Sequence, residues 1–135
     1  MATCILWNDR LLLNFEPLDE QHKQIFTRIA EIEFLANEDA PKEAILYKLK
    51  QLRSEVISHF EYEEALMSFC ADSYNSEEHM TSHELVIVYI DYALLATSRS
   101  EYREIINGFA NELFDAVMQH DSNLVEALIL SGKIS

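Results

Sequence analysis

Two pairs of ionisable residues interrupt apolar helical stripes in the middle of the chain. His59 and Glu63 lie four positions apart, and so do His79 and His83. Residues at i and i+4 point the same way from a helix, so each pair projects from one face. Because unpaired ionisable groups are costly in an apolar core, these side chains need a shared partner. A metal ion is the partner that imidazole and carboxylate groups have in common.

Two further polar residues fall on inward stripes elsewhere in the chain. His22 lies one turn before Ile25, and Asp121 lies four positions after Val117. Each residue alone is explained by a hydrogen bond in the core or by solvent, but six such explanations would have to coincide on one face. Four imidazoles and two carboxylates are too many donors for one tetrahedral zinc ion. They suit two ions of iron, zinc or manganese bridged by the carboxylates.

The segments that carry these residues have the pattern of four helices after an extended N-terminal arm. The arm, residues 1–17, has no sustained helical period. Apolar residues at helical spacing, separated by polar breaks, predict helices over about residues 18–37, 41–67, 76–97 and 101–130. Amphipathic helices joined by short breaks bury their stripes best as a bundle. The sequence therefore predicts a single all-α domain over residues 1–135, an antiparallel up-and-down four-helix bundle.

Composition agrees with this fold and excludes several function classes. Two Gly and two Pro in 135 residues are too few for an all-β sandwich with many tight turns. Ten Lys+Arg against 24 Asp+Glu give a net charge of −14, which disfavours nucleic acid and anionic membranes as partners. No run approaches the ~18 apolar residues of a membrane span. No signal peptide is visible, and Cys4 and Cys70 are isolated, so we expect a cytoplasmic protein.

The motifs around the polar residues resemble those of a known family. They are Leu18-Asp-Glu-Gln-His-Lys-Gln-Ile-Phe26, His59-Phe-Glu-Tyr-Glu-Glu64 and His79-Met-Thr-Ser-His-Glu84. Over nearly its whole length the chain resembles a bacterial hemerythrin domain, a relative of the myohemerythrin that exemplifies this type of bundle. The Trp7 side chain in the arm also fits the resemblance.

This resemblance implies a centre of two non-heme iron ions with an oxo or hydroxo bridge that binds O₂. The iron ligands that it implies are His79 and His83 on one iron, His22 and His59 on the other, and Glu63 and Asp121 as bridges.

The last motif departs from the family pattern, in which a His is followed five positions later by the bridging Asp. Aligning Asp121 places Ala116 at the His position, whereas aligning His120 places Val125 at the Asp position. We favour the Asp121 register because Val125 cannot bridge metal ions, and His120 remains a candidate ligand or a partner of a ligand. Water, hydroxide or a small anion would then fill the position that Ala116 leaves.

The resemblance implies two functional classes. One is a sensory input domain for O₂ or another small diatomic or redox signal, coupled to a C-terminal effector as in diguanylate cyclases and chemotaxis receptors. A missing ligand favours this class, because an open site should oxidise readily in air and carry O₂ poorly. The alternative is a free-standing O₂ storage or carrier protein. We do not expect an enzyme, since the chain lacks Glu-x-x-His pairs and a His-Glu-x-x-His motif.

Aromatic residues surround the predicted centre. Phe26 and Phe60 are candidates for the wall of the pocket, although ordinary core packing also explains them. Tyr62, Tyr89 and Tyr92 are candidates for hydrogen bonds near the site, although helical periodicity does not place them.

Overall fold

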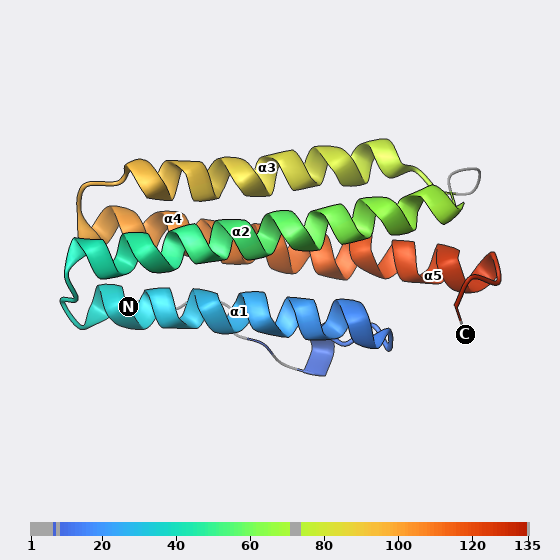
Figure 1. The fold of residues 1–135 in the computed structure, drawn as a ribbon, viewed down its shortest axis with the longest axis horizontal. Coiled ribbons are helices and arrows are strands. Elements are labelled where there is room, and N and C mark those ends of the chain that lie inside the picture. The colour runs from blue at the N-terminus through green and yellow to red at the C-terminus, as the bar shows by residue number, and fades with distance from the viewer. Residues whose placement is uncertain (1–6, 8, 71–73, 135) are drawn as a thin grey trace.

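Four long antiparallel rods make up the chain (Figure 1). The structure is a computed structural model that describes residue 7, residues 9–70 and residues 74–134. Three rods are single helices, and the fourth is an α-helix, a π-helical segment and a second α-helix in succession. Their bounds are α1 Glu16–Asn37, α2 Lys42–Met67, α3 Ser76–Leu95, α4 Arg99–Ala116, η3 Val117–Asp121 and α5 Ser122–Leu130. Two 3-10 helices, η1 Asp9–Leu11 and η2 Ser68–Cys70, flank α1 and α2.

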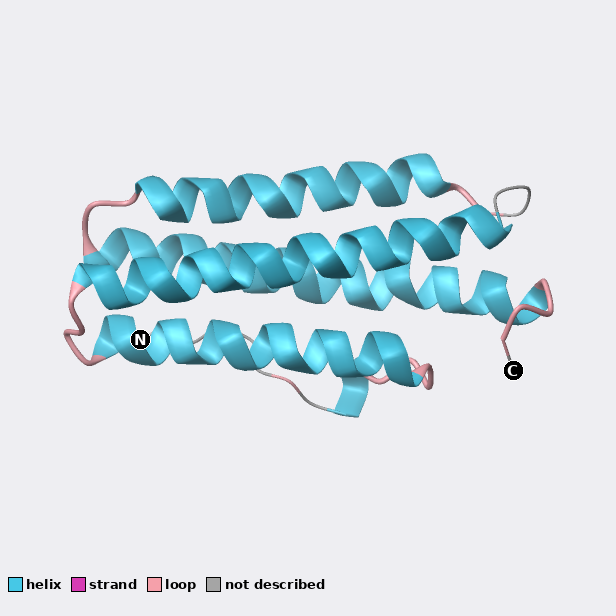
Figure 2. Cartoon of the chain, viewed as in Figure 1, coloured by secondary structure: helices cyan, strands magenta, loops and turns pink. Residues whose placement is uncertain are grey.

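The predicted all-α four-helix bundle is confirmed. Figure 2 shows only helices and loops among the described residues. Each rod packs against two neighbours, α1 and α3 both lying against α2 and α4. The α1–α2 and α3–α4 links lie at one end of the bundle, and the α2–α3 link and the end of α5 lie at the other (Figure 1). The start of α1, the end of α2 and the start of α3 are therefore close to the second half of the fourth rod.

Apolar side chains fill the bundle in two clusters. The larger one occupies most of its length and includes Phe26, Leu49, Ile90 and Phe109, which are fully buried. A smaller cluster lies toward the end with the α2–α3 link and contains Met67, Cys70, Leu124 and Leu128. Each large side chain removed from water contributes roughly 1.5–3 kcal/mol. No helix among the described residues has the length and apolar composition that a membrane crossing requires.

Helix ends are set by local sequence. The Asn75 side chain accepts a hydrogen bond from the Glu78 amide at the start of α3, and Ser98 does the same for the Glu101 amide in α4. Past the end of α5, Gly132 has a φ of 77°, a left-handed conformation that favours glycine, and closes the helix.

The N-terminal arm is fastened to the first turn of α1. The Asp19 carboxylate accepts hydrogen bonds from the backbone amides of Leu13, at 2.8 Å, and Phe15, at 3.2 Å. Leu11 is completely buried, and Trp7 packs partly buried against the larger cluster. Residues 1–6, which include Cys4, lie outside the described residues.

One departure from the sequence pattern matters for the site. The pattern predicts one continuous helix over 101–130, whereas the structure has a π-helical turn at Val117–Asp121. A π turn closes i→i+5 hydrogen bonds and so holds one residue more than an α turn. Apolar spacing did not reveal it, because Val117, Leu124 and Leu128 fall on the inward stripe either way.

Candidate metal centre

A layer of buried polar side chains lies between the two apolar clusters. All four rods contribute to it, and each of its residues is at most 4% exposed. Its members are His22 on α1, His59 and Glu63 on α2, His79 and His83 on α3, and Asp121 at the end of η3. The structure thus brings together all six residues that the sequence singled out as candidate ligands.

Asp121 is the residue of the fourth rod that faces this layer. The buried stripe of α4 passes through Leu113 and reaches Ala116 and Val117. One α turn of 3.6 residues after these two residues, the inward position falls near residues 120 and 121, so helical phase alone does not choose between them. The structure places Asp121 inward, at 2% exposed, and leaves His120 at the rim. The geometry therefore favours the Asp121 register over the His120 register.

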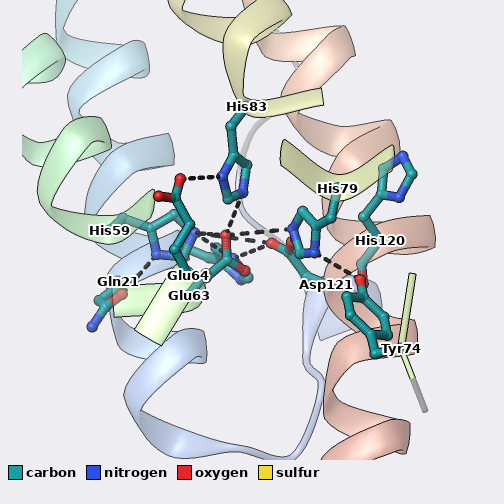
Figure 3. Close-up of polar contacts among 10 residues, drawn as sticks. Gln21, His59, Glu63, Glu64, Tyr74, His79, His83, His120 and Asp121 are labelled. Carbon is teal, nitrogen blue, oxygen red and sulfur yellow. Dashed lines mark hydrogen bonds and ion pairs between the residues drawn. The ribbon is translucent and has the colours of Figure 1, made fainter. Parts of the chain in front are cut away.

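The two carboxylates lie between two sets of imidazoles. Asp121 Oδ2 is 2.8 Å from His22 Nε2, and its Oδ1 is 2.7 Å from His79 Nε2. Glu63 Oε1 is 3.2 Å from His59 Nε2 and 3.0 Å from His83 Nε2 (Figure 3). Two groups of four donors result, and they have both carboxylates in common. Such sharing is the arrangement that two bridged metal ions require.

Groups behind two of the imidazoles fix which nitrogen carries a proton. His59 Nδ1 lies 2.6 Å from Gln21 Oε1, and His83 Nδ1 lies 3.1 Å from Glu64 Oε2. Amide and carboxylate oxygens only accept, so both rings donate from Nδ1. Their Nε2 atoms face carboxylate oxygens, and a nitrogen lone pair that faces an oxygen at this distance needs a cation between them. That cation is a proton or a metal ion.

Several atoms of the layer have no hydrogen-bond partner among the described residues. They are His22 Nδ1, Glu63 Oε2 and His79 Nε2. His79 Nε2 is close to Asp121, but the contact lacks hydrogen-bond geometry. Buried polar atoms are rarely left unpaired, so the unpartnered Glu63 Oε2 and His79 Nε2, which belong to the two groups of donors, fit a site built for bound cations.

Charge within the layer favours cations. Burial lowers the pKa of His59, but the carboxylates of Glu63 and Asp121 outweigh burial and raise it to about 10. Burial likewise lowers the pKa of His79, but Asp121 and Glu63 outweigh burial and raise it to about 9. Burial raises the pKa of Asp121, yet its imidazole neighbours hold it well below the ordinary value. In the metal-free protein, protons on imidazoles therefore balance the carboxylates, and a bound metal would displace them.

The remaining predicted residues lie as follows. Ala116 is buried, at 6% exposed, and its methyl group offers no ligand atom. His120 is partly exposed, and its ring stacks on that of His79 with centroids 5.4 Å apart. It lines a surface groove of about 680 Å³ between α3 and the fourth rod. His120 thus lies behind His79, as a neighbour of a candidate ligand.

A tyrosine outside the three candidates Tyr62, Tyr89 and Tyr92 hydrogen-bonds to the layer. Tyr74, in the link before α3, places its hydroxyl 2.7 Å from His79 Nδ1. Tyr92 is 61% exposed, and the Tyr89 ring packs against Gly108. Helical periodicity carries no signal for a residue in a link, so the sequence pattern did not find Tyr74. Among the predicted wall residues, Phe60 stacks on the His83 ring, 3.7 Å between centroids.

The other two backing groups, Gln21 and Glu64, adjoin predicted ligands in the sequence. Each is the immediate neighbour of a layer residue, Gln21 of His22 and Glu64 of Glu63. Each nevertheless bonds to an imidazole on a different rod, Gln21 to His59 and Glu64 to His83. Adjacency was the only sequence signal for them, and it does not indicate which imidazole they contact.

Comparisons with known proteins agree with the motifs. Over 126 residues the chain is 26% identical to the bacteriohemerythrin of Pseudomonas aeruginosa strain LESB58. The aligned region covers 92% of this chain and 81% of that protein. The bacteriohemerythrin of Pseudomonas paraeruginosa strain DSM 24068 / PA7 is 27% identical over 128 residues, with the same coverage. No family model matches the chain, and no solved structure matches it. These homologues confirm the resemblance, and together with the buried layer they support an iron-binding, hemerythrin-like domain.

Proposed function

We propose that this chain is a hemerythrin-type di-iron domain that binds O₂ or another small redox signal. The ligands of this proposal are His22 and His59 for one iron, His79 and His83 for the other, and Glu63 and Asp121 between them. One observation carries it: two buried groups of four donors share both of their carboxylates. A single metal ion held by one of these groups would leave the two imidazoles of the other group unpaired in the core.

The donor set supports two irons. Imidazole and carboxylate together suit iron, zinc or manganese, and the homologues named bacteriohemerythrin favour iron. A pair of non-heme irons, joined by an oxo or hydroxo bridge, supplies reversible redox chemistry with O₂ when it is bound. We infer a binding or sensing role for the domain rather than enzymatic turnover.

The side chains of this layer have three tasks. The carboxylates of Glu63 and Asp121 offset positive charge in a buried place, where it would otherwise be costly. Gln21 and Glu64 hold imidazoles with Nε2 facing inward, which keeps the donor atoms in place before a metal arrives. Phe60 covers the His83 ring and excludes water from that side.

A sensory input role is the first candidate for this domain, with an effector that responds to its redox state. It is supported by Ala116, because a site with one imidazole fewer is more open to water and oxidises more readily. A domain that oxidises in air reports on oxygen or redox state but stores O₂ poorly. The cytoplasmic location stays a prediction.

Free-standing O₂ storage is the second candidate, and one observation favours it. The chain covers 81% of the bacteriohemerythrins that it matches, so those proteins have little length left for an effector domain. The two candidates differ in what happens after exposure to O₂. A storage protein must give O₂ back, whereas a sensor of this kind stays oxidised until it is reduced.

Oxidation in air tests the proposal and separates the candidates. Protein loaded with ferrous iron without oxygen would be mixed with air, and the near-ultraviolet bands of a bridged ferric pair would be followed. Rapid, lasting bands are expected for the sensor, and a state that reverts when O₂ is removed would favour storage. Absence of bound iron would contradict both.

The variant Ala116→His sharpens this test by restoring the family imidazole. It should slow the oxidation, whereas Ala116→Leu fills the same space without a donor and should not. Extra bulk at this buried position costs about 1–3 kcal/mol in either variant, so the two have matched strain. Equal oxidation rates in both variants would show that position 116 does not control the site.

A further inference from the structure

The Tyr74 hydroxyl joins two elements of the candidate metal centre. It lies 2.7 Å from Nδ1 of His79 on α3 and 2.9 Å from the backbone carbonyl of His120 in η3 (Figure 3). His120 immediately precedes Asp121, so this one hydroxyl contacts a candidate ligand and the backbone beside another. Gln21 and Glu64, by contrast, each contact one imidazole.

The direction of both hydrogen bonds follows from the number of protons. A carbonyl oxygen only accepts, and a phenol has one proton to give. Tyr74 must therefore donate to the His120 carbonyl and accept from His79. Nδ1 of His79 then carries a proton, and its Nε2 faces Asp121 and Glu63 with a lone pair whenever the ring is neutral. Burial raises the pKa of Tyr74, so the phenol keeps its proton at neutral pH.

We propose that Tyr74 is a positioning residue of the metal centre, which fixes the tautomer of His79 and ties that ring to the π turn that carries Asp121. The proposal rests on the proposed function, because it concerns the same site. Groups that orient a metal-binding imidazole are typically worth 10- to 100-fold in metal affinity.

The first test needs no metal and no variant. Nitrogen-15 NMR of the metal-free protein, at a pH high enough that the His79 ring is neutral, reports which ring nitrogen carries the proton. We expect the proton on Nδ1. A proton on Nε2 would overturn the proposal whether or not the chain binds iron.

The second test compares Tyr74→Phe with Tyr102→Phe. Tyr102 is a buried tyrosine whose hydroxyl has no hydrogen-bond partner among the described residues, so the loss of that hydroxyl is a control. In an anaerobic ferrous titration, Tyr74→Phe should weaken binding of one iron by about 10- to 100-fold, and Tyr102→Phe should not. The His79 ring should also lose its single tautomer in Tyr74→Phe alone.

Each outcome of these tests has one meaning. Unchanged iron affinity and an unchanged tautomer in a folded Tyr74→Phe variant would overturn the proposal. If that variant does not fold, the NMR result on the unaltered chain decides. Failure of the unaltered chain to bind iron would contradict the proposed function, and the NMR result would still judge the role of Tyr74.

Discussion

The two halves of the candidate centre share their carboxylates but are held from behind in different ways. In the half on α1 and α2, His59 donates to Gln21, whereas Nδ1 of His22 is buried without a hydrogen-bond partner among the described residues. The two rings pack edge to face, with centroids 4.6 Å apart. His22 is therefore oriented from behind mainly by packing.

Hydrogen bonds hold the half on α3. Tyr74 backs His79 and Glu64 backs His83, so both outward-facing nitrogens have partners. In this layer, packing orients the ring that the core surrounds, whereas hydrogen bonds orient the rings that lie near a link or at the exposed edge of a helix.

The largest effect is expected from Asp121→Asn, because Asp121 belongs to both halves. The amide keeps the size of the side chain but removes the charge that faces His22 and His79. We expect iron affinity to fall in both halves by ~100-fold or more, beyond what the loss of an outer partner causes. Iron titration monitored by absorbance measures it.

The control for this variant is Asp19→Asn, which alters a buried aspartate outside the centre. It should loosen the N-terminal arm and leave both irons bound. Two irons retained in Asp121→Asn would show that Asp121 does not bridge.

His22→Ala and His79→Ala compare the halves directly. Each variant removes one of two imidazoles from one half, so each should lose one iron and keep the other. If the centre has two imidazoles per half, the two losses should be similar in size. Metal content and iron titrations measure them, and a much milder effect of His79→Ala would mean that another donor, such as His120, completes that half.

A pH dependence is expected of the metal-free protein. The pKa values of His59 and His79 are raised from 6.5 to about 10 and about 9, so their contribution to stability is full below pH 6.5. It is lost as the pH rises through 9 to 10. The pKa of Asp121 is lowered, so its contribution is present above its ordinary value and is lost on acidification.

Urea unfolding at several pH values measures this profile. The free energy of unfolding should decline between pH 7 and pH 10, and iron binding should strengthen over the same range because fewer protons compete. In Asp121→Asn the decline should be shallower, since one of the charges that raise both imidazole pKa values is gone. A profile that is flat from pH 6.5 to 10 in the unaltered chain would contradict the arrangement of charges described here.

The smallest effect is expected from His120→Ala. His120 stacks on His79 but lies partly exposed at the rim of the bundle, outside the buried layer. Iron content and the absorption spectrum should stay unchanged. Loss of an iron in this variant would reinstate His120 as a ligand and reject the Asp121 register.

The sequence alone was sufficient to predict the four rods and the six residues of the buried layer, because both follow from the spacing of residues along the chain. His59 with Glu63 and His79 with His83 repeat every four residues on stripes that are otherwise apolar. Any helix buries such a stripe, so the pattern predicts both the bundle and the layer within it.

The rest depends on backbone geometry that spacing does not encode. The π turn at Val117–Asp121 leaves the apolar pattern unchanged on either side, so the pattern does not reveal it. Tyr74 reaches His79 through the path of a link rather than through helical phase. The π turn adds one residue to a helical turn, and Tyr74 contributes one hydroxyl. Only the folded chain specifies where each of them lies.

Iron content per chain tests the central claim most directly. Protein loaded with ferrous iron without oxygen and freed of loosely held metal would be analysed for iron and zinc. Two irons per chain, falling to about none in Asp121→Asn, is the expected result. One metal ion per chain, or none, would show that the shared carboxylates do not join two iron sites.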